Sequence, residues 1–230
     1  KTLMHEAGIP TAAFEVFTDY DKALAYVRKV GAPIVVKASG LALGKGVYVC
    51  HTVEDAERGL KEIMLDRLFK DSGSTVVIEE FLEGQEISIH ALCHGTDFIL
   101  FPPTQDHKRA LEGDQGPNTG GMGVVGPLGW VTPAMMDDIG RTIVRPTLEA
   151  LKAKNALFTG LLYPGLMMTQ AGPKVLEFNA RFGAPESEVY MRLMESDLLD
   201  ALQGGPISWR ASYAANMMLV LFSPGAAIAT

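Results

Sequence analysis

The sequence predicts an α+β fold in which strands pair mainly as antiparallel hairpins beside helices. Strand-like and helical segments alternate along the chain, and many strand-like segments come in neighbouring pairs. Short turns such as His94-Gly95 and Ala171-Gly172 join these pairs. Neighbouring parallel strands need a longer crossover, usually a helix. A doubly wound parallel sheet is therefore the less favoured alternative.

The first third of the chain has clear helix and strand signals. Residues 1–10 indicate a short polar helix and a turn. Apolar residues at helical spacing predict a helix over 21–30, which Gly31-Ala32-Pro33 ends. β-Branched residues predict strands over 34–37, 47–50 and 75–80. Thr52 is a candidate N-cap for a helix that runs to about Asp66.

The remaining elements follow the same reasoning. We expect a strand over 86–93 with a hairpin partner at 97–101, a helix over 133–154 and a hairpin over 159–179. A helix over 187–203 and a strand over 212–222 complete the chain. Residues 102–133 are rich in Gly and Pro and show no periodicity, which indicates an irregular, functional segment. We therefore expect a small lobe over 1–80, a large lobe over 81–211 and the start of a further domain over 212–230.

Composition excludes several classes of protein. The 230 residues include 20 Lys and Arg against 27 Asp and Glu, and this net charge of −7 argues against binding to nucleic acid. No apolar run reaches the 18 residues of a membrane span. Cys50 and Cys93 are too few for a disulfide framework, which fits the reducing cytoplasm, and with His51 and His94 they match no zinc spacing. We interpret them as core cysteines.

A glycine-rich loop follows the strand that ends at Lys37. The run Lys37-Ala-Ser-Gly-Leu-Ala-Leu-Gly-Lys45-Gly46 contains three glycines and two lysines. Glycines let backbone amides approach an anion closely, and lysines add charge for a triphosphate. The loop lacks the spacing of a Walker A motif and of a dinucleotide-binding fingerprint. A flexible hairpin turn with surface lysines is the alternative.

A charged turn follows the strand that ends at Glu79-Glu80. The run continues Phe81-Leu82-Glu83-Gly84-Gln85-Glu86. Carboxylates at a strand end can accept hydrogen bonds from ribose hydroxyls. Phe81 and Leu82 would flank an adenine ring. A solvated turn between two strands explains the same residues without a ligand.

A third candidate site is the run Glu177-Phe178-Asn179-Ala180-Arg181. The two-residue period of a strand places Glu177, Asn179 and Arg181 on one face. A carboxylate and an amide oxygen suit Mg²⁺, which keeps several waters and shares phosphate oxygens. Arg181 would then contact a phosphate or an acyl phosphate. An edge strand with one solvated face is the alternative.

The long irregular segment carries Gln105-Asp106-His107-Lys108-Arg109 and then Gly116-Pro117-Asn118-Thr119-Gly120-Gly121-Met122-Gly123. Charged groups beside a glycine nest suit a small zwitterion and a phosphate. A solvated loop is the alternative. Further on, Glu186 and Glu188 fit either a carboxylate pair or the acids that helix N-termini attract.

Together these segments resemble the ATP-grasp portion of the phosphoribosylamine–glycine ligase family, over about residues 1–213. Lys-Gly loops and Glu-x-Asn strands occur across ATP-grasp enzymes. Gln-Asp-His-Lys-Arg followed by Asn-Thr-Gly-Gly-Met-Gly is more particular to this family. The resemblance implies an ATP-grasp fold of two α+β lobes with a nucleotide between them. It also implies a ligase that joins glycine to 5-phosphoribosylamine through glycyl phosphate, a step of purine biosynthesis.

The resemblance also implies roles for individual residues. It assigns ATP binding to Lys37, Gly44, Lys45, Gly46, Glu79, Glu80, Phe81, Leu82 and Glu86. It assigns Mg²⁺ or Mn²⁺ binding to Glu177 and Asn179, and catalytic roles to Lys45, Lys108 and Arg181. It assigns substrate contacts to Asp106, His107, Lys108, Arg109, Asn118, Thr119, Gly120 and Gly121.

The sequence departs from the family pattern at Ala184, where Asp is usual in Arg-Phe-Gly-Asp-Pro-Glu. The family's N-terminal domain and most of its C-terminal domain also have no counterpart in the sequence. Two alternatives therefore stay open: an ATP-grasp ligase for another acid, and a Mg·ATP-binding module without turnover. The expected partners are small-molecule substrates. A monomer and a fusion to other purine-pathway domains are both compatible with the resemblance.

Overall fold

The computed structural model describes residues 1–40, 46–113 and 115–217, which fall into two compact units. The smaller unit is Ala12–Leu82, and the larger unit combines Lys1–Thr11 with the chain from Glu83 onward. The predicted small lobe over 1–80 was therefore wrong for the first eleven residues. Met4 and Ile9 belong to the core of the larger unit, and the Pro10 carbonyl accepts a hydrogen bond from Val175 at 2.8 Å.

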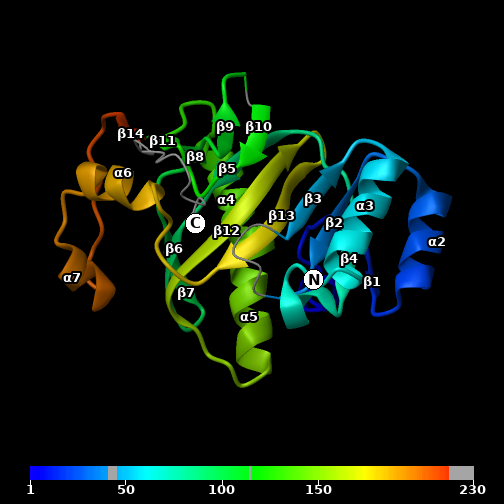
Figure 1. The fold of residues 1–230 in the computed structure, drawn as a ribbon. Helices are drawn as coiled ribbons and strands as arrows, with labels where there is room; N and C mark the ends of the chain where they lie inside the picture. The colour runs from blue at the N-terminus through cyan, green and yellow to red at the C-terminus, as the bar shows by residue number, and fades with distance from the viewer. Residues whose placement is uncertain (41–45, 114, 218–230) are drawn as a thin grey trace. The chain divides into compact units, whose positions relative to one another are not determined.

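The smaller unit contains an antiparallel four-stranded sheet covered on one face by two helices (Figure 1). The strand order is β1 (Phe14–Phe17), β4 (Val76–Glu80), β2 (Ile34–Ala38) and β3 (Val47–Cys50). The helices are α2 (Tyr20–Val30) and α3 (Val53–Met64), and a short 3₁₀ helix, η1, spans Lys70–Gly73. Sequence reasoning predicted all of these elements except β1 and η1.

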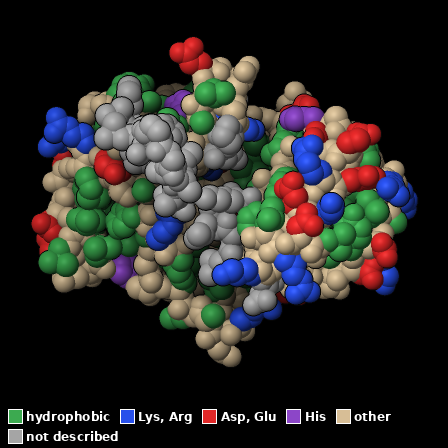
Figure 2. Space-filling view, viewed as in Figure 1, with side chains coloured by type: hydrophobic (Ala, Val, Ile, Leu, Met, Phe, Trp, Pro, Cys, Tyr) green, Lys and Arg blue, Asp and Glu red, His purple; other side chains and the backbone are tan. Residues whose placement is uncertain are grey.

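Capping residues in the sequence determine where both helices of the smaller unit begin. The side chains of Asp19 and Thr52 cap α2 and α3 by accepting the amides of Lys22 and Asp55. Apolar residues on the inner faces then pack on the sheet; the core residues include Val27, Val36, Leu60, Ile63 and Ile78. Figure 2 shows acidic and basic side chains interspersed over α2 and α3, the pattern of a solvated surface.

The larger unit is built on an antiparallel five-stranded sheet. Its strands are β13 (Gly172–Asn179), β12 (Thr159–Thr169), β6 (Ala91–His94) and β7 (Asp97–Leu100), with β5 (Gln85–Ser88) also paired to β12. The helical stretch α4 (Pro133–Ile139), η2 (a π-helical segment, Gly140–Val144) and α5 (Arg145–Ala153) packs on one face (Figure 1). The helix α1 (Thr2–Glu6) adds Met4 to the same core.

Strand alternation gives this sheet two different faces. Ile87, Ile89, Ala91 and Cys93 enter the core beneath the helical stretch. The intervening residues point to the other face, where Leu92 packs with residues of α6 (Glu186–Leu193) and α7 (Leu198–Leu202). The predicted strand over 86–93 is interrupted at Ile89, since β5 ends at Ser88 and β6 begins at Ala91, but its alternation of faces persists.

The expected helix over 187–203 was wrong in its middle. Met194 is extended, with φ −68° and ψ 132°, and forms a β-bridge with Trp209. Asp197 then caps a separate helix, α7, because its carboxylate accepts the amides of Leu199 and Asp200.

The expected absence of regular structure over 102–133 was also wrong. Four short strands lie there: β8 (Gln105–Asp106), β9 (Arg109–Leu111), β10 (Gln115–Asn118) and β11 (Gly123–Gly126). β9 pairs with β10, whereas β11 lies between β8 and β14 (Ala214–Met217) in a small sheet. The predicted strand over 212–222 is observed over Ala214–Met217, and its remainder lies outside the described residues. No helix among the described residues is long and apolar enough to cross a membrane.

Candidate functional site

Lys37 and Glu79, two predicted ATP-binding residues, form an ion pair in the smaller unit. Lys37 Nζ lies 3.0 Å from Glu79 Oε2. The side chain of Glu79 is only 3% exposed and that of Lys37 is 19% exposed. Val36 and Ile78, the neighbours of this pair in sequence, point to the helix-covered core. Alternation therefore places the ion pair on the opposite face of the sheet, with the ammonium group still accessible.

The predicted adenosine segment follows β4 directly. Glu80 is exposed, and its amide donates to the Ala13 carbonyl at 2.9 Å. The ring of Phe81 packs edge-on against His51, with 5.5 Å between the centroids. Leu82 is 8% exposed. The segment is thus anchored by its backbone and by apolar side chains, and Glu80 lies at an exposed position.

The predicted phosphate loop is described only at its ends. The Gly46 carbonyl accepts the Ala38 amide at 2.8 Å and so joins the end of β2 to the start of β3. Gly46 is buried. Gly44 and Lys45 lie outside the described residues.

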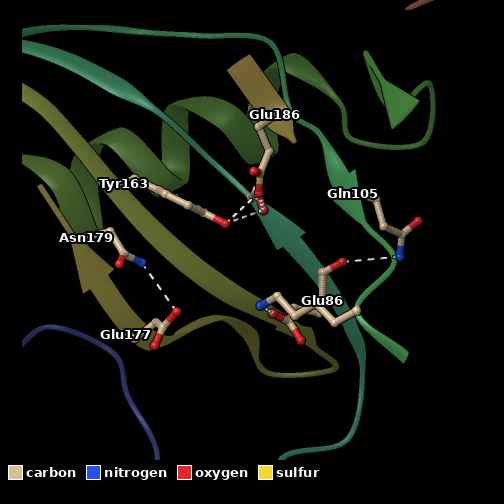
Figure 3. Close-up of polar contacts among 8 residues, drawn as sticks. Glu86, Gln105, Tyr163, Glu177, Asn179 and Glu186 are labelled. Carbon is tan, nitrogen blue, oxygen red and sulfur yellow. Dashed lines mark hydrogen bonds and ion pairs between the residues drawn. The ribbon is translucent and has the colours of Figure 1, made fainter. Parts of the chain in front are cut away.

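In the larger unit, several predicted residues share the sheet face that the long helical stretch does not cover (Figure 3). Strand register sets Ser88, Gly165 and Glu177 opposite one another across β5, β12 and β13. The neighbouring pair on β12 and β13 is Tyr163 and Asn179. A Cβ at Gly165 would lie 3.6 Å from Glu177 Cγ, so a side chain on the middle strand would pack directly against this carboxylate side chain.

A β-bulge at Leu176 brings Glu177 to this face. Gly165 pairs with Glu177, whereas the next residue, Leu166, pairs with Val175, so Leu176 is the extra residue of the bulge. Residues two apart normally share a face, but one extra residue reverses that relation. Val175 therefore lies in the core while Glu177 points to the opposite, polar face.

Lys108 forms an ion pair with Glu86 at this face. Burial alone would lower the pKa of Lys108, but the nearby carboxylates of Glu86, Glu177 and Asp106 outweigh burial and raise it. Gln105 also donates to the Glu86 backbone carbonyl at 3.2 Å. Lys108 is thus a permanently charged group among carboxylates that come from three different strands or segments.

Hydrogen bonds join the two predicted substrate segments. The Thr119 amide and hydroxyl both donate to the Lys108 carbonyl, at 2.7 and 2.8 Å. The Thr119 hydroxyl oxygen in turn accepts the Gly121 amide at 3.1 Å. The predicted nest around Thr119, Gly120 and Gly121 is therefore hydrogen-bonded to Lys108, in the short segment between β8 and β9.

Two predicted substrate residues point elsewhere. His107 is exposed, with Nδ1 3.3 Å from the Gly123 carbonyl. The Arg109 guanidinium donates to the Gly116 carbonyl at 2.7 Å. The backbone of Asn118 pairs with that of Arg109 in the β9–β10 ladder. These contacts shape the loop itself.

Glu177 and Asn179 are suited to a hard divalent cation. The Asn179 side-chain amide donates to Glu177 Oε1 at 3.3 Å, and Glu177 is exposed. One carboxylate and one amide oxygen match Mg²⁺ or Mn²⁺ that takes its other ligands from water and phosphate. Among the described residues, no cluster of three or more His, Cys, Asp or Glu forms a complete protein cage for a metal.

Arg181 does not lie on the strand as predicted. β13 ends at Asn179, and Arg181 belongs to the turn that leads to α6. Its guanidinium donates to the Phe182 carbonyl at 2.8 Å, and its side chain is exposed. Arg181 is therefore an exposed turn residue and not part of the strand face that carries Glu177 and Asn179.

Sequence reasoning missed a buried polar network beside this site. Glu186 is 1% exposed, and its Oε1 accepts hydrogen bonds from Ser88 at 2.8 Å and Tyr163 at 2.6 Å. Figure 3 shows Tyr163 and Glu186 pointing toward each other. In the sequence, Glu186 fits a carboxylate pair with Glu188 or an acid attracted to a helix start. Ser88 and His90 in an otherwise apolar strand were the signal that could have revealed the network.

His90 is fully buried and joins this network to the turn after Gly183. The Gly183 amide donates to His90 Nε2 at 3.0 Å, so the imidazole proton is on Nδ1, which lies 2.9 Å from the Tyr190 hydroxyl. The ring also stacks on Tyr163, with 4.1 Å between centroids. Burial, and secondarily the charge of Arg181, lower the pKa of His90 to about 3. The imidazole is therefore neutral.

Asp106 lies close to the same network. Its Oδ1 is buried without a hydrogen-bond partner among the described residues. Burial, and then the neighbouring carboxylate of Glu186, raise the pKa of Asp106 to about 7, although Lys108 opposes them. The carboxyl groups of Asp106 and Glu186 thus share one region of the larger unit, where they interact unfavourably.

The fold and these side chains define an ATP-grasp protein. The biotin carboxylase domain of the 2-oxoglutarate carboxylase from Hydrogenobacter thermophilus superposes with a TM-score of 0.71 over 94% of this chain and 48% of that chain. At 18% identity this likeness shows the fold alone. Residues 1–187 match the family "Phosphoribosylglycinamide synthetase, ATP-grasp (A) domain", and the chain belongs to that family.

Individual relatives agree with this assignment. The phosphoribosylamine–glycine ligase of Streptococcus pyogenes serotype M6 is 51% identical over 197 residues, which cover 86% of this chain and 47% of that protein. The crystal structure of the Thermotoga maritima enzyme of the same name superposes with a TM-score of 0.85 at 35% identity, over 94% of this chain and 56% of that one. The chain thus spans about half the length of the curated relatives it matches.

Proposed function

We propose that this chain is the ATP-binding part of a ligase that joins glycine to 5-phosphoribosylamine in purine biosynthesis. The glycine carboxylate would attack the γ-phosphate of ATP to give glycyl phosphate and ADP. The amine would then displace phosphate to give glycinamide ribonucleotide. The observation that carries the proposal is the polar face of the larger sheet, where Glu86, Lys108, Glu177 and Asn179 converge in a chain of this family.

The smaller unit would supply most of the nucleotide contacts. Lys37 is positioned by Glu79 and would contact phosphate oxygens. The loop residues Gly44, Lys45 and Gly46 would surround the triphosphate. Glu80, Phe81 and Leu82 would seat the adenosine together with Glu86. Phosphoryl transfer needs positioning and charge stabilisation rather than a protein nucleophile, and these groups supply both.

The larger unit would hold the reacting groups. Glu177 and Asn179 would hold Mg²⁺ or Mn²⁺, which supplies charge neutralisation at the phosphates when bound. Arg181, exposed at the turn, would stabilise the acyl phosphate, and Lys108 would contact the transferred phosphoryl group. Glycine and phosphoribosylamine would be held by two segments. One carries Asp106, His107 and Arg109, and the other runs from Asn118 to Gly121.

The test uses the full-length protein from which the sequence derives. ADP release should require ATP, a divalent metal and glycine, and glycinamide ribonucleotide should form when phosphoribosylamine is added. Lys37→Ala should weaken ATP binding strongly, because a phosphate partner is lost. Lys29→Ala, at an exposed position on α2, is the matched control and should leave ATP binding unchanged.

Three outcomes would change the assignment. ADP release with another amino acid but not with glycine would identify a different carboxylate–amine ligase. Mg²⁺-dependent ATP binding without ADP release would identify a binding module, and recovery of turnover by Ala184→Asp would trace the defect to that position. No ATP binding by folded protein would refute the proposal. A cytoplasmic location is proposed together with this function.

A further inference from the structure

His90 is a buried histidine whose ring is held in place by neighbouring aromatic side chains. The ring stacks on Tyr163 at an angle of 22° between the planes, and the ring of Tyr190 meets its edge at 4.8 Å between centroids. The backbone is held as well, because the His90 carbonyl accepts the Phe101 amide at 2.8 Å. The two nitrogen atoms of the imidazole therefore occupy defined positions inside the larger unit.

The hydrogen bonds around His90 form a chain with one consistent direction. The Gly183 amide can only donate, so Nε2 accepts it and the proton of the neutral ring lies on Nδ1. Nδ1 then donates to the Tyr190 hydroxyl, which can donate in turn to Thr104 Oγ1 at 3.1 Å. The Thr104 hydroxyl donates to the Ser88 carbonyl at 3.3 Å. Every donor in this chain has an acceptor, whereas an imidazolium would set an N–H group against the Gly183 N–H.

The first donor of this chain, Gly183, belongs to the turn over residues 180–185 that also carries Arg181. The Gly183 carbonyl accepts the Ser187 amide at 3.0 Å, which is a local contact within four residues. The bond from the Gly183 amide to His90 instead joins the turn to the segment between β5 and β6. A Cβ at Gly183 would lie 3.1 Å from His90 Nε2, so the backbone of the turn lies directly against the imidazole.

A neutral acceptor suits a position close to Arg181. Burial is the main cause of the lowered pKa of His90, and the positive charge of Arg181 is the second, so the two side chains are near enough to interact. A carboxylate in the place of the imidazole would attract the guanidinium and compete with an anionic ligand for it. The imidazole accepts the backbone amide of the turn without adding a charge.

We propose that His90 is a positioning residue for Arg181, which it orients by holding the backbone of the turn over 180–185 through the Gly183 amide. The inference rests on the proposed function, which gives Arg181 the acyl phosphate to stabilise. A displacement of about 1 Å in a catalytic group can reduce the rate about 100-fold. Because Arg181 acts on charge that develops during the reaction, a displaced turn should lower kcat and leave the KM for ATP nearly unchanged.

Hydrogen–deuterium exchange of the full-length protein tests whether His90 holds the turn. His90→Phe keeps an aromatic ring but removes both hydrogen bonds, whereas His90→Gln can still accept from Gly183. Ile143→Ala is the matched control, because Ile143 is fully buried in the core on the other face of the sheet. The amides of residues 180–187 should exchange about 5- to 100-fold faster in His90→Phe alone, since a buried donor loses its acceptor. Unchanged exchange in His90→Phe would refute the proposal.

Steady-state kinetics of the same variants separate positioning from packing. In His90→Phe the kcat of glycine-dependent ADP release should fall about 10- to 100-fold, and the KM for ATP should stay within about threefold. His90→Gln should recover most of the lost kcat, because the acceptor is restored. Ile143→Ala should lose stability while its kcat stays within about threefold of the wild type. Equal losses of kcat in His90→Phe and Ile143→Ala would refute the positioning role.

A double-mutant cycle with Arg181→Ala tests whether His90 acts through Arg181. In the Arg181→Ala enzyme, His90→Phe should lower kcat by less than about threefold, because the group that it positions is already gone. A full additional 10- to 100-fold loss would refute the coupling and leave the ligase assignment intact. A wild-type enzyme that forms no ADP with any amino acid would refute the proposed function, and with it the catalytic part of this inference, even if the exchange of the turn changes as expected.

Discussion

Burial of neutral His90 should make the stability of the larger unit depend on pH. The pKa of His90 is lowered to about 3 in the folded protein, because burial disfavours the imidazolium. The ordinary value, near 6.5, applies to the unfolded chain. Between these two values the unfolded chain binds more protons than the folded protein. The contribution of His90 to stability is therefore present at neutral pH and is lost as the pH falls from about 6.5 toward 3.

The size of the effect follows from these two pKa values. Between pH 8 and pH 5 the free energy of unfolding should fall by about 2 kcal/mol through His90 alone. Asp106 acts in the opposite direction: its pKa is raised to about 7, so its contribution is lost as the pH rises through that value. The total pH dependence of the protein mixes both groups. A comparison with a variant that lacks the imidazole isolates His90.

His90→Gln is the appropriate variant, because its amide can still accept the Gly183 amide and donate to the Tyr190 hydroxyl. Urea unfolding at pH 8 and pH 5 should be followed by tryptophan fluorescence, since Trp130 and Trp209 both belong to the larger unit. The wild type should lose about 2 kcal/mol more than the variant between these two pH values. An equal loss in the two proteins would refute the argument that His90 is buried in neutral form.

Three further predictions concern other parts of the chain. Gly121→Ala should abolish ligase turnover, because a Cβ there would lie 2.5 Å from Pro185 Cδ at a φ of +123°; kinetics with ADP release as readout would check this. Leu60→Ala should destabilise the smaller unit by about 2–5 kcal/mol in chemical unfolding. The buried thiols of Cys50 and Cys93, whose pKa burial raises to about 11, should resist thiol reagents at pH 8 until urea unfolds the protein.

The helices of the smaller unit show what the sequence can predict. α3 carries its own start signal in Thr52 and a continuous apolar stripe that includes Leu60 and Ile63. Both signals act over a few residues, so no knowledge of distant contacts is needed. The same holds for the β12–β13 hairpin, which was predicted from a turn at Ala171-Gly172 and is closed one residue earlier, by Gln170-Ala171.

Elements that depend on distant partners escaped prediction. β8 has only two residues and exists because β11, about twenty residues later, pairs with it. β1 likewise needs β4, which follows it by about sixty residues. A strand of two to four residues carries too little periodicity to stand out by itself. Met194 ended a predicted helix for the same reason, since its bridge to Trp209 is a tertiary contact.

The motifs contained part of the candidate site, whereas contacts between distant segments determine the rest. Glu86, Lys108, Glu177 and Asn179 were found from their motifs, whereas Gly44 and Lys45 lie outside the described residues. The motifs did not show how Glu177 reaches the site. In a regular strand it would share the core-facing side of Val175, and only the bulge at Leu176 reverses it.

The polar residues that sequence reasoning missed have one feature in common. Each forms a hydrogen bond with a residue that lies far away in the sequence. Ser88 bonds to Glu186, 98 residues later, and His90 bonds to Gly183, 93 residues later. In the sequence each is a single polar residue within an apolar strand, which a core position and a functional position explain equally well. The structure distinguishes the core explanation from the functional one, because the segment that carries Arg181 also carries Gly183 and Glu186. The buried network thus fixes the backbone of the turn that carries the exposed guanidinium of Arg181.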